Sequence, residues 1–343
     1  MGDHGTPKAT RKYVTDRLEH VPSVLGSTEL VVSPFGFGGY RVAPDFEDHK
    51  KALKLAIAKG INLIDTSTNY TDGGSETLVG EVLAEMFGAG AVNREDLVVV
   101  TKAGYLQGQN LQQAMLRRDQ GRPYPEVTVV NDNCWHCFNP EFLDEQLTAS
   151  LTRLRLQTVD VLLLHNPEYF FDKSDDQDEF YRRIKAAFAF LESAVQDGRI
   201  KAYGISSNTF GTDDKDPKFV SLERVWQIAE EISASHHFKV IQLPFNLLEP
   251  VGLTIRNNQK IAALLYAEKK RLGTLINRPF NGFYQGKMIR LAEYQVHRAV
   301  PDRDQITQVL QDAIKLEQTY PPGDCMALGE LPVGAQLSQN FNQ

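Results

Sequence analysis

The amino-acid sequence predicts an α/β protein, and within that class it favours a (β/α)8 TIM barrel. Short runs of β-branched and other apolar residues alternate seven times with amphipathic helical stretches. An open, doubly wound sheet fits the same alternation. Polar residues at the carboxyl ends of several predicted strands favour the barrel, because a barrel gathers these ends around one mouth.

Each predicted strand is short and apolar, as expected of strands that are buried on both faces. The predicted strands cover residues 30–33 with 35–38, 60–65, 97–102, 159–165, 201–206, 239–243 and 273–277. The predicted helices cover about 46–59, 75–87, 140–156, 178–197, 218–234, 254–271 and 304–319. Capping residues or prolines mark helix starts at Asp45, Ser75, Asn139-Pro140 and Asp216-Pro217.

Two segments interrupt the alternation. Residues 105–138 are longer than ordinary connections, which rarely exceed about 12–15 residues, so we expect an inserted lid over the barrel mouth. Residues 321–343 are polar, and no eighth strand is recognisable, so the last β/α unit is expected to be missing or irregular. We therefore expect a single barrel domain over 1–343, with its core at about 30–320.

Composition excludes several classes of protein. Lysine and arginine number 37 against 44 aspartates and glutamates, and a net charge of −7 does not suit nucleic-acid binding. No run approaches the roughly 18 apolar residues of a membrane span, so no membrane association is expected. The three cysteines, Cys134, Cys137 and Cys325, are too few and uneven for a disulfide framework. A reducing compartment, the cytosol, is therefore expected.

Four polar residues are candidates for catalysis. Asp65, Lys102 and His165 each end a predicted strand, and Tyr70 follows in the loop after Asp65. Taken singly, each has a plain structural alternative: a turn cap, a lysine whose charge reaches solvent, a core histidine and a loop anchor. Taken together, they would form a proton-donating site. A nearby ammonium would lower the pKa of the phenol from about 10, and the phenol could then protonate a carbonyl oxygen.

This set of residues resembles the aldo-keto reductases. Motifs in the family's order carry the resemblance: Gly36-Phe37-Gly38-Gly39-Tyr40, Asn62-Leu63-Ile64-Asp65-Thr66 with Tyr70, Gly74-Ser75-Glu76 with Gly80, Val100-Thr101-Lys102, Asp160 with Leu163-Leu164-His165, Gly198-Arg199-Ile200-Lys201 with Gly204-Ile205-Ser206, and Gln242-Leu243-Pro244-Phe245-Asn246-Leu247. The resemblance implies an NADP- or NAD-dependent oxidoreductase. It also implies that Tyr70 is the general acid/base, that Lys102 and Asp65 tune it, and that His165 orients the substrate carbonyl.

The resemblance further implies which residues bind the cofactor. Gly39, Tyr40 and Asp65 would lie along the nicotinamide and its ribose, and Ser206 and Gln242 would bind the carboxamide.

The chain departs from the family pattern at three places in this set. Ser207 or Asn208 would replace the usual amide, and Asn277 stands where an aromatic ring commonly stacks on the nicotinamide. No basic module after the seventh unit is recognisable. Arg278 could therefore bind the pyrophosphate, or it could be a solvated loop arginine.

Cys134-Trp135-His136-Cys137 has the spacing of half a metal site. A closed zinc site needs four ligands, and no second pair accompanies this one, so no metal is expected; a redox pair is a further alternative to an ordered lid segment.

The expected function is the reduction of an aldehyde, a ketone or a sugar, or the reverse oxidation. The alternatives are a cofactor-binding regulatory subunit with little turnover, and an incomplete, inactive barrel. The sequence leaves the oligomeric state open.

Overall fold

The computed structural model describes residues 2–18, 21–284 and 287–292, together with residues 304, 307, 308, 311, 312 and 315. The chain forms two compact units, Met1–Ile289 and Arg290–Gln343. The fold described below is that of the first unit. Of the helix expected over 304–319, the six described residues are helical. The rest of it, with the tail over 321–343, lies outside the described residues.

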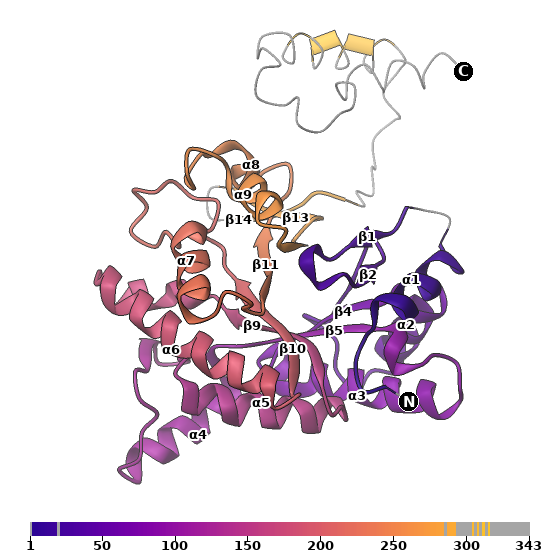
Figure 1. The fold of residues 1–343 in the computed structure, drawn as a ribbon, viewed down its shortest axis with the longest axis horizontal. Coiled ribbons are helices and arrows are strands. Elements are labelled where there is room, and N and C mark those ends of the chain that lie inside the picture. The colour runs from indigo at the N-terminus through magenta and orange to yellow at the C-terminus, as the bar shows by residue number, and fades with distance from the viewer. Residues whose placement is uncertain are drawn as a thin grey trace. The chain divides into compact units, whose positions relative to one another are not determined.

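The centre of the first unit is a parallel sheet of seven strands (Figure 1). In spatial order its strands are β3 (Phe37–Gly38), β4 (Leu63–Asp65), β5 (Val98–Ala103), β9 (Val159–His165), β10 (Ile200–Ser206), β11 (Phe238–Pro244) and β12 (Gly273–Asn277). Every neighbouring pair is parallel, as right-handed β/α units require. All seven strands coincide with expected ones.

Two separate apolar cores show that the sheet is curled. One core lies between the sheet and the helices, and the other is formed by alternate residues of the strands. The second core brings together Leu63 of β4 and Leu275 of β12, which are near opposite ends of the strand order. The predicted barrel class is confirmed. Among the described residues no eighth strand joins this sheet. Most of the segment after residue 292, on which the expectation of a missing or irregular last unit depends, lies outside them.

Six helices follow the strands and match the expected ranges closely over most of the chain. They are α2 (Glu47–Ala58), α3 (Gly74–Gly88), α5 (Pro140–Leu154), α6 (Gln177–Gln196), α7 (Leu222–Ile232) and α9 (Ala263–Lys269). Figure 1 shows α5, α6 and α7 on the outside of the strands. Asn139 caps α5 with Pro140 in its first turn, as predicted. Within the described residues, none of the helices has both the length and the apolar composition needed to cross a membrane.

Three of the predicted capping residues are wrong, although α2 and α3 start within one residue of the expected positions. Helix α2 begins after Phe46 rather than at Asp45, and α7 is capped by Ser221 instead of Asp216-Pro217. Helix α3 begins at Gly74, because the Ser75 hydroxyl bonds Thr66 and does not cap the helix.

The helix expected over 254–271 is wrong in its first half. The chain forms a short helix α8 (Val251–Thr254), then a turn, and only then α9. Gln259 and Lys260 have positive φ angles of 48° and 65°, which an α-helix does not permit. The Asn257 side chain donates to the carbonyl groups of Phe210 and Thr212, and these bonds to another part of the chain favour the turn.

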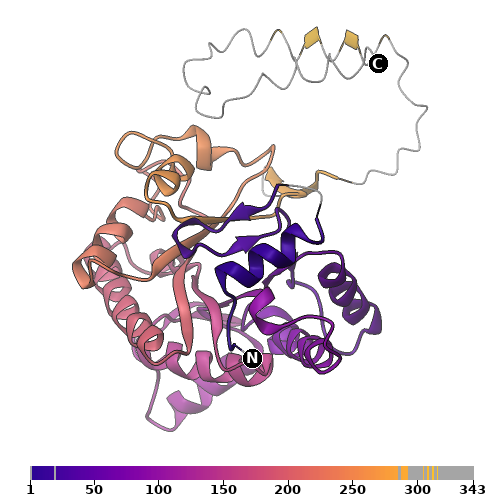
Figure 2. The same cartoon turned by 45° about the vertical axis from the view of Figure 1, so that its right-hand side comes forward.

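The expected first strand is divided between two sheets. Phe37–Gly38 joins the parallel sheet, whereas β2 (Val31–Val32) pairs antiparallel with β1 (Ser23–Val24). A helix that was not expected, α1 (Pro7–Thr15), packs on this hairpin, and the Val31 N–H donates to the Thr10 hydroxyl at 3.1 Å. Figure 2 shows α1 and the hairpin together in indigo. Leu25 and Val32 enter the core inside the barrel, so the hairpin helps to fill it.

The long connection over 105–138 is a folded unit. It contains β6 (Tyr105–Leu106), α4 (Gly108–Asp119), β7 (Thr128–Asn131) and β8 (Cys134–His136), and its strands form an antiparallel sheet in the order β6-β8-β7. Within residues 2–18, 21–284 and 287–292, the remaining elements are four 3-10 turns and a two-stranded sheet. They are η1 (Gly26–Thr28), η2 (Tyr70–Gly73), η3 (Arg94–Asp96), η4 (Pro167–Asp172), β13 (Asn281–Tyr284) and β14 (Lys287–Arg290).

Two glycines of α3 give a matched test of how closely this helix packs. A Cβ added at Gly80 would lie 2.2 Å from the Arg153 carbonyl oxygen of α5, whereas a Cβ at Gly88 would meet no atom within 4 Å. We expect Gly80→Ala to lower the free energy of unfolding by about 1–3 kcal/mol through overpacking. Gly88→Ala should leave it unchanged or raise it by up to ~1 kcal/mol. Urea denaturation measures both, and equal effects would contradict the close approach.

Candidate active site

Four of the candidate residues meet at the carboxyl edge of the sheet. Asp65 ends β4, Lys102 lies near the end of β5, His165 ends β9, and Tyr70 begins the 3-10 turn η2. The Lys102 ammonium is fully buried and donates to Asp65 Oδ2 at 2.9 Å, to the Thr66 carbonyl at 2.8 Å and to the Tyr70 hydroxyl at 3.3 Å. The Tyr70 and His165 rings are in edge contact, with centroids 5.8 Å apart.

The loop after Tyr70 is held in a strained conformation. Thr71 and Asp72 have positive φ angles of 46° and 57°, a region that costs non-glycine residues about 1–3 kcal/mol each. The Thr71 hydroxyl donates to the Val42 carbonyl at 2.7 Å, and Asp72 accepts the Gln109 N–H at 2.9 Å. Because Gln109 lies in α4, the inserted unit helps to fix the loop that carries Tyr70.

The protonation of the four groups follows from burial and mutual charge. Burial raises the pKa of Tyr70 above its ordinary value, and Lys102, which acts in the opposite direction, does not offset it. The expectation that Lys102 lowers this pKa overall is therefore wrong. Burial lowers the pKa of Lys102, but Asp65 and Tyr70 outweigh burial and leave it raised. Burial and then the Lys102 charge lower the pKa of His165 well below its ordinary value, so its imidazole is neutral.

The surroundings of His165 contain residues that the sequence analysis did not assign to this site. The Ser67 hydroxyl lies 3.0 Å from His165 Nδ1, and the Tyr105 ring packs edge-on with its centroid 4.7 Å away. His136 Nε2 lies 2.7 Å from the His165 carbonyl oxygen. Burial lowers the pKa of His136 to about 4, so neutral His136 donates this bond. Tyr105 and His136 belong to the inserted unit, and no periodic signal in the sequence marks them.

The expected carboxamide residues also come together. Ser206 is in register with His165 on one side and with Gln242 on the other. Its hydroxyl donates to Gln242 Oε1 at 3.0 Å, and the Ser207 N–H donates to the Gln242 carbonyl at 2.9 Å. The Asn208 side chain instead accepts a bond from Arg278, so Ser207 is the better placed replacement for the usual amide.

The remaining expected cofactor residues lie at the same edge. The Gly39 N–H donates to the Asp65 carbonyl at 2.8 Å, and the exposed Tyr40 ring contacts that of Tyr70, with centroids 5.1 Å apart. Asn277 ends β12. Arg278 follows with a positive φ of 56° and pairs with Glu249 at 2.7 Å, and its side chain is half-buried.

Three of the expected and neighbouring residues at this edge carry buried acceptor atoms without donors. Asp65 Oδ1, Glu168 Oε2 and Asn277 Oδ1 are buried and accept no hydrogen bond from the described part of the chain. Buried polar atoms are almost always paired, by protein, water or ligand. The hydroxyl groups of a ribose and the N–H of a carboxamide are donors of the kind that these three oxygens require.

The cysteine motif does not form a metal centre in the part of the chain that is described. Cys134 and Cys137 are buried free thiols. No group of three or more His, Cys, Asp or Glu side chains that could hold a metal ion occurs among the described residues. Burial raises the pKa of Cys134 and raises that of Cys137 to about 12. Buried, protonated thiols do not favour the redox alternative.

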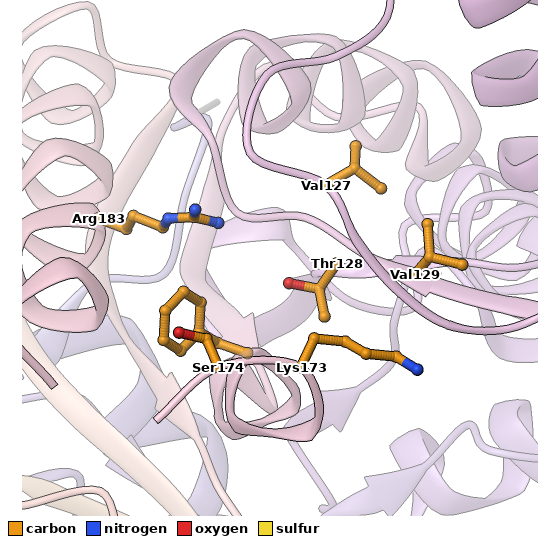
Figure 3. A pocket seen from close by; sticks show the side chains of 7 residues that line it. Val127, Thr128, Val129, Lys173, Ser174 and Arg183 are labelled. Atoms are coloured by element: carbon orange, nitrogen blue, oxygen red, sulfur yellow. The ribbon is translucent and has the colours of Figure 1, made fainter. Parts of the chain in front are cut away.

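A cavity of about 540 Å³ lies away from these residues (Figure 3). It is lined by Val127, Thr128, Val129, Phe170, Lys173, Ser174 and Arg183. Arg183 at its rim is already held by Glu179 at 2.7 Å and by the Glu126 carbonyl at 2.8 Å. The cavity shares no residue with the group around Tyr70.

Glu168 is a buried carboxyl group at the carboxyl edge of the sheet, where the candidate catalytic residues lie, and the sequence did not reveal it. Burial raises its pKa from 4.5 to about 7. The stability that the neutral acid contributes is therefore present below pH ~4.5 and is lost as the pH rises through about 7. At about 1.4 kcal/mol per pKa unit the loss is of the order of 3 kcal/mol. We expect Glu168→Gln to unfold at higher urea than the native chain at pH 8, with little difference at pH 5. An equal difference at both pH values would contradict this account.

A sequence model described as "Aldo/keto reductase family" matches residues 34–320. Among curated proteins, the chain is 30% identical over 232 residues to "Putative voltage-gated potassium channel subunit beta" of Schizosaccharomyces pombe, covering 66% of this chain and 51% of that protein. It is 26% identical over 191 residues to the NADH-specific methylglyoxal reductase of Escherichia coli, covering 53% of this chain and 51% of that protein. The chain therefore spans about half the length of these relatives.

A solved structure supports the assignment of the fold. The holo form of an aldo-keto reductase from Bacillus halodurans is similar, with a TM-score of 0.50 and 18% identity, over 85% of this chain and 76% of that one. At this identity the likeness concerns the fold, and it agrees with the curled parallel sheet.

Proposed function

The chain belongs to the aldo/keto reductase family, and on that premise we propose that it is an oxidoreductase that interconverts a carbonyl compound and an alcohol. One observation carries the proposal: the Tyr70 hydroxyl lies 3.3 Å from the buried Lys102 ammonium. The proposed cofactor is NADP, with NAD as the alternative. The proposed substrate is an aldehyde, a ketone or a sugar, and the likeness to a methylglyoxal reductase supports a small carbonyl compound.

In the proposed mechanism, a bound nicotinamide supplies or accepts the hydride. The Tyr70 hydroxyl donates a proton to the carbonyl oxygen in reduction, and its phenolate takes the proton back in oxidation. Lys102, which Asp65 holds in place at 2.9 Å, stabilises the negative charge that Tyr70 acquires. Neutral His165, oriented by Ser67, offers its second ring nitrogen to the carbonyl oxygen.

We assign the cofactor to the carboxyl edge of the sheet. Ser206, Ser207 and Gln242 would bind the carboxamide, and Asp65 would accept a ribose hydroxyl through its free Oδ1. The other proposed contacts are Gly39, Tyr40, Asn277 and Arg278. A cytosolic location is proposed on the sparse cysteine set.

A second candidate is a regulatory subunit that binds the cofactor with little turnover. Asn277 supports it, because this side chain replaces the aromatic ring that the family commonly stacks on the nicotinamide. The likeness to a protein named as a channel subunit supports it as well.

Two measurements on the full chain distinguish these functions. Fluorescence titration with NADPH and NADH measures cofactor binding, and an assay of aldehydes, ketones and aldoses measures turnover, with Tyr70→Phe as the inactive control. Binding with turnover that depends on Tyr70 supports the oxidoreductase. Binding without turnover supports the regulatory subunit, and absence of binding contradicts both.

A further inference from the structure

The buried carboxyl group of Glu168 takes no part in the mechanism proposed for the four catalytic residues. Its side chain is 4% exposed and follows Pro167 at the start of η4. Oε1 accepts the Asn208 N–H at 2.8 Å. Oε2 is buried and no described donor is paired with it, although the side chains of Ser207 and Asn208 act on this carboxyl group and lower its pKa. Burying a carboxylate oxygen without a hydrogen-bond donor raises the free energy of the folded chain. A donor from a bound ligand would lower it.

The position of Glu168 indicates which donor this is. It bonds Asn208, which follows Ser206 and Ser207 in the turn after β10, and its charge also acts on the buried Tyr105 hydroxyl. The Tyr105 ring in turn packs on His165. Glu168 therefore lies at the carboxyl edge of the sheet, near both the proposed carboxamide residues and the proposed catalytic ones.

Gln242 supplies the complementary half of the argument. Its Oε1 already accepts the Ser206 hydroxyl at 3.0 Å, which leaves its NH₂ group as a donor. Among the described residues, none accepts a hydrogen bond from that NH₂ group. A carboxamide has one carbonyl acceptor and one NH₂ donor. Gln242 can serve the acceptor, but the donor needs an oxygen with a free lone pair. Glu168 Oε2 and Asn277 Oδ1 both have one. Of the two, Glu168 is the residue bonded to the turn that carries Ser206 and Ser207.

We propose that Glu168 is a further cofactor-binding residue, whose Oε2 accepts an N–H of the nicotinamide carboxamide beside Gln242. The proposal rests on the proposed function, since it requires that the chain bind a nicotinamide cofactor. In this proposal, Glu168 binds the amide group of the cofactor and does not contact its ring or ribose.

The test compares two cofactors that differ only at the amide. NADPH and its reduced 3-acetylpyridine analogue, in which a methyl group replaces the NH₂, are titrated into the full chain at pH 8. This pH lies above the pKa of about 7 of Glu168, so the carboxylate is ionised. A hydrogen bond to a charged group corresponds to roughly tenfold in affinity, so we expect the native chain to bind NADPH about tenfold more tightly than the analogue.

Glu168→Gln keeps the size of the side chain but places an NH₂ group or an uncharged oxygen at the Oε2 position. We expect its preference for NADPH to fall to within about twofold, with little change in affinity for the analogue. The matched control is Glu192→Gln. Glu192 is also buried, but it accepts bonds from the Tyr203 hydroxyl and the His237 N–H. The Glu192→Gln protein should therefore keep the native preference for NADPH. Thermal melting confirms that both variants are folded.

The outcomes separate the two proposals. If Glu168→Gln keeps the native preference, or weakens both cofactors equally, the role of Glu168 is overturned and the proposed function stands. If the native chain binds NADPH and the analogue equally well, the role is likewise overturned. If the native chain binds neither, both proposals fail.

Discussion

Replacing Tyr70 by phenylalanine is expected to lower kcat for carbonyl reduction by about 10²–10⁴-fold, the usual contribution of a positioned general acid. The substitution removes the hydroxyl that lies 3.3 Å from Lys102 but keeps the ring that contacts Tyr40 and His165. Cofactor affinity should therefore change by no more than about twofold. Steady-state kinetics on the best substrate of the carbonyl panel, together with nicotinamide fluorescence titration, measures both quantities.

A second buried tyrosine provides the control. Tyr266 of α9 is 1% exposed and takes no part in the site, so Tyr266→Phe should leave kcat unchanged. A Tyr70→Phe protein that keeps more than a tenth of the native kcat would remove Tyr70 from the mechanism.

The protonation state of Tyr70 also predicts how kcat varies with pH. Burial raises the pKa of the phenol above its ordinary value of 10, so the acid form persists throughout the neutral range. In the proposed mechanism, reduction uses the protonated phenol, so kcat should show no loss from titration of Tyr70 between pH 6 and about 9. A decline across this range that Tyr70→Phe abolishes would show a lower pKa than burial implies.

Asp160→Asn is expected to lower the free energy of unfolding by about 3–5 kcal/mol, the range found when one partner of a buried ion pair is removed. Asp160 lies in β9 and is 1% exposed. It accepts bonds from the Arg94 guanidinium at 2.7 Å, the Val99 N–H at 2.7 Å and the Gly5 N–H at 2.6 Å. Asparagine would leave the Arg94 charge without its counter-ion. Urea denaturation at pH 7 measures the loss.

An exposed pair of the same chemistry gives the comparison. Asp144 pairs with Arg199 at 2.5 Å, and its side chain is 52% exposed. Asp144→Asn should change the free energy of unfolding by less than about 1 kcal/mol, because solvent screens the pair. Equal losses in the two variants would mean that burial does not set the strength of the Asp160 interaction.

The sequence predicted the strands of the barrel more accurately than the segments between them. Strands such as β5 and β9 are uniformly buried, so their apolar runs have one consistent explanation. The turn within 254–271 was missed because its cause is not local: the Asn257 side chain bonds the carbonyl groups of Phe210 and Thr212. The inserted unit was expected as a lid, and its small sheet gave no periodic signal of its own.

In the candidate site, too, the sequence identified residues at strand ends but not those in the connecting segments. Asp65, Lys102 and His165 could be found because each lies at or next to the end of a strand, and parallel strands bring such residues to one edge. Glu168 and His136 could not be found in this way, because one lies in a 3-10 turn and the other in the inserted sheet. The wrong direction for the pKa of Tyr70 has a similar origin, since the sequence reveals the neighbouring charge but not the depth of burial.

The sequence by itself determined the order of the β/α units and the residue types at the ends of the strands. Both depend on hydrophobic pattern and residue identity, which are local properties of the chain. Only the tertiary structure decided which polar atoms are buried and which of them have partners. Desolvation and hydrogen bonding depend on every segment that packs around a group, and for Tyr70, His165 and Glu168 those segments come from distant parts of the chain.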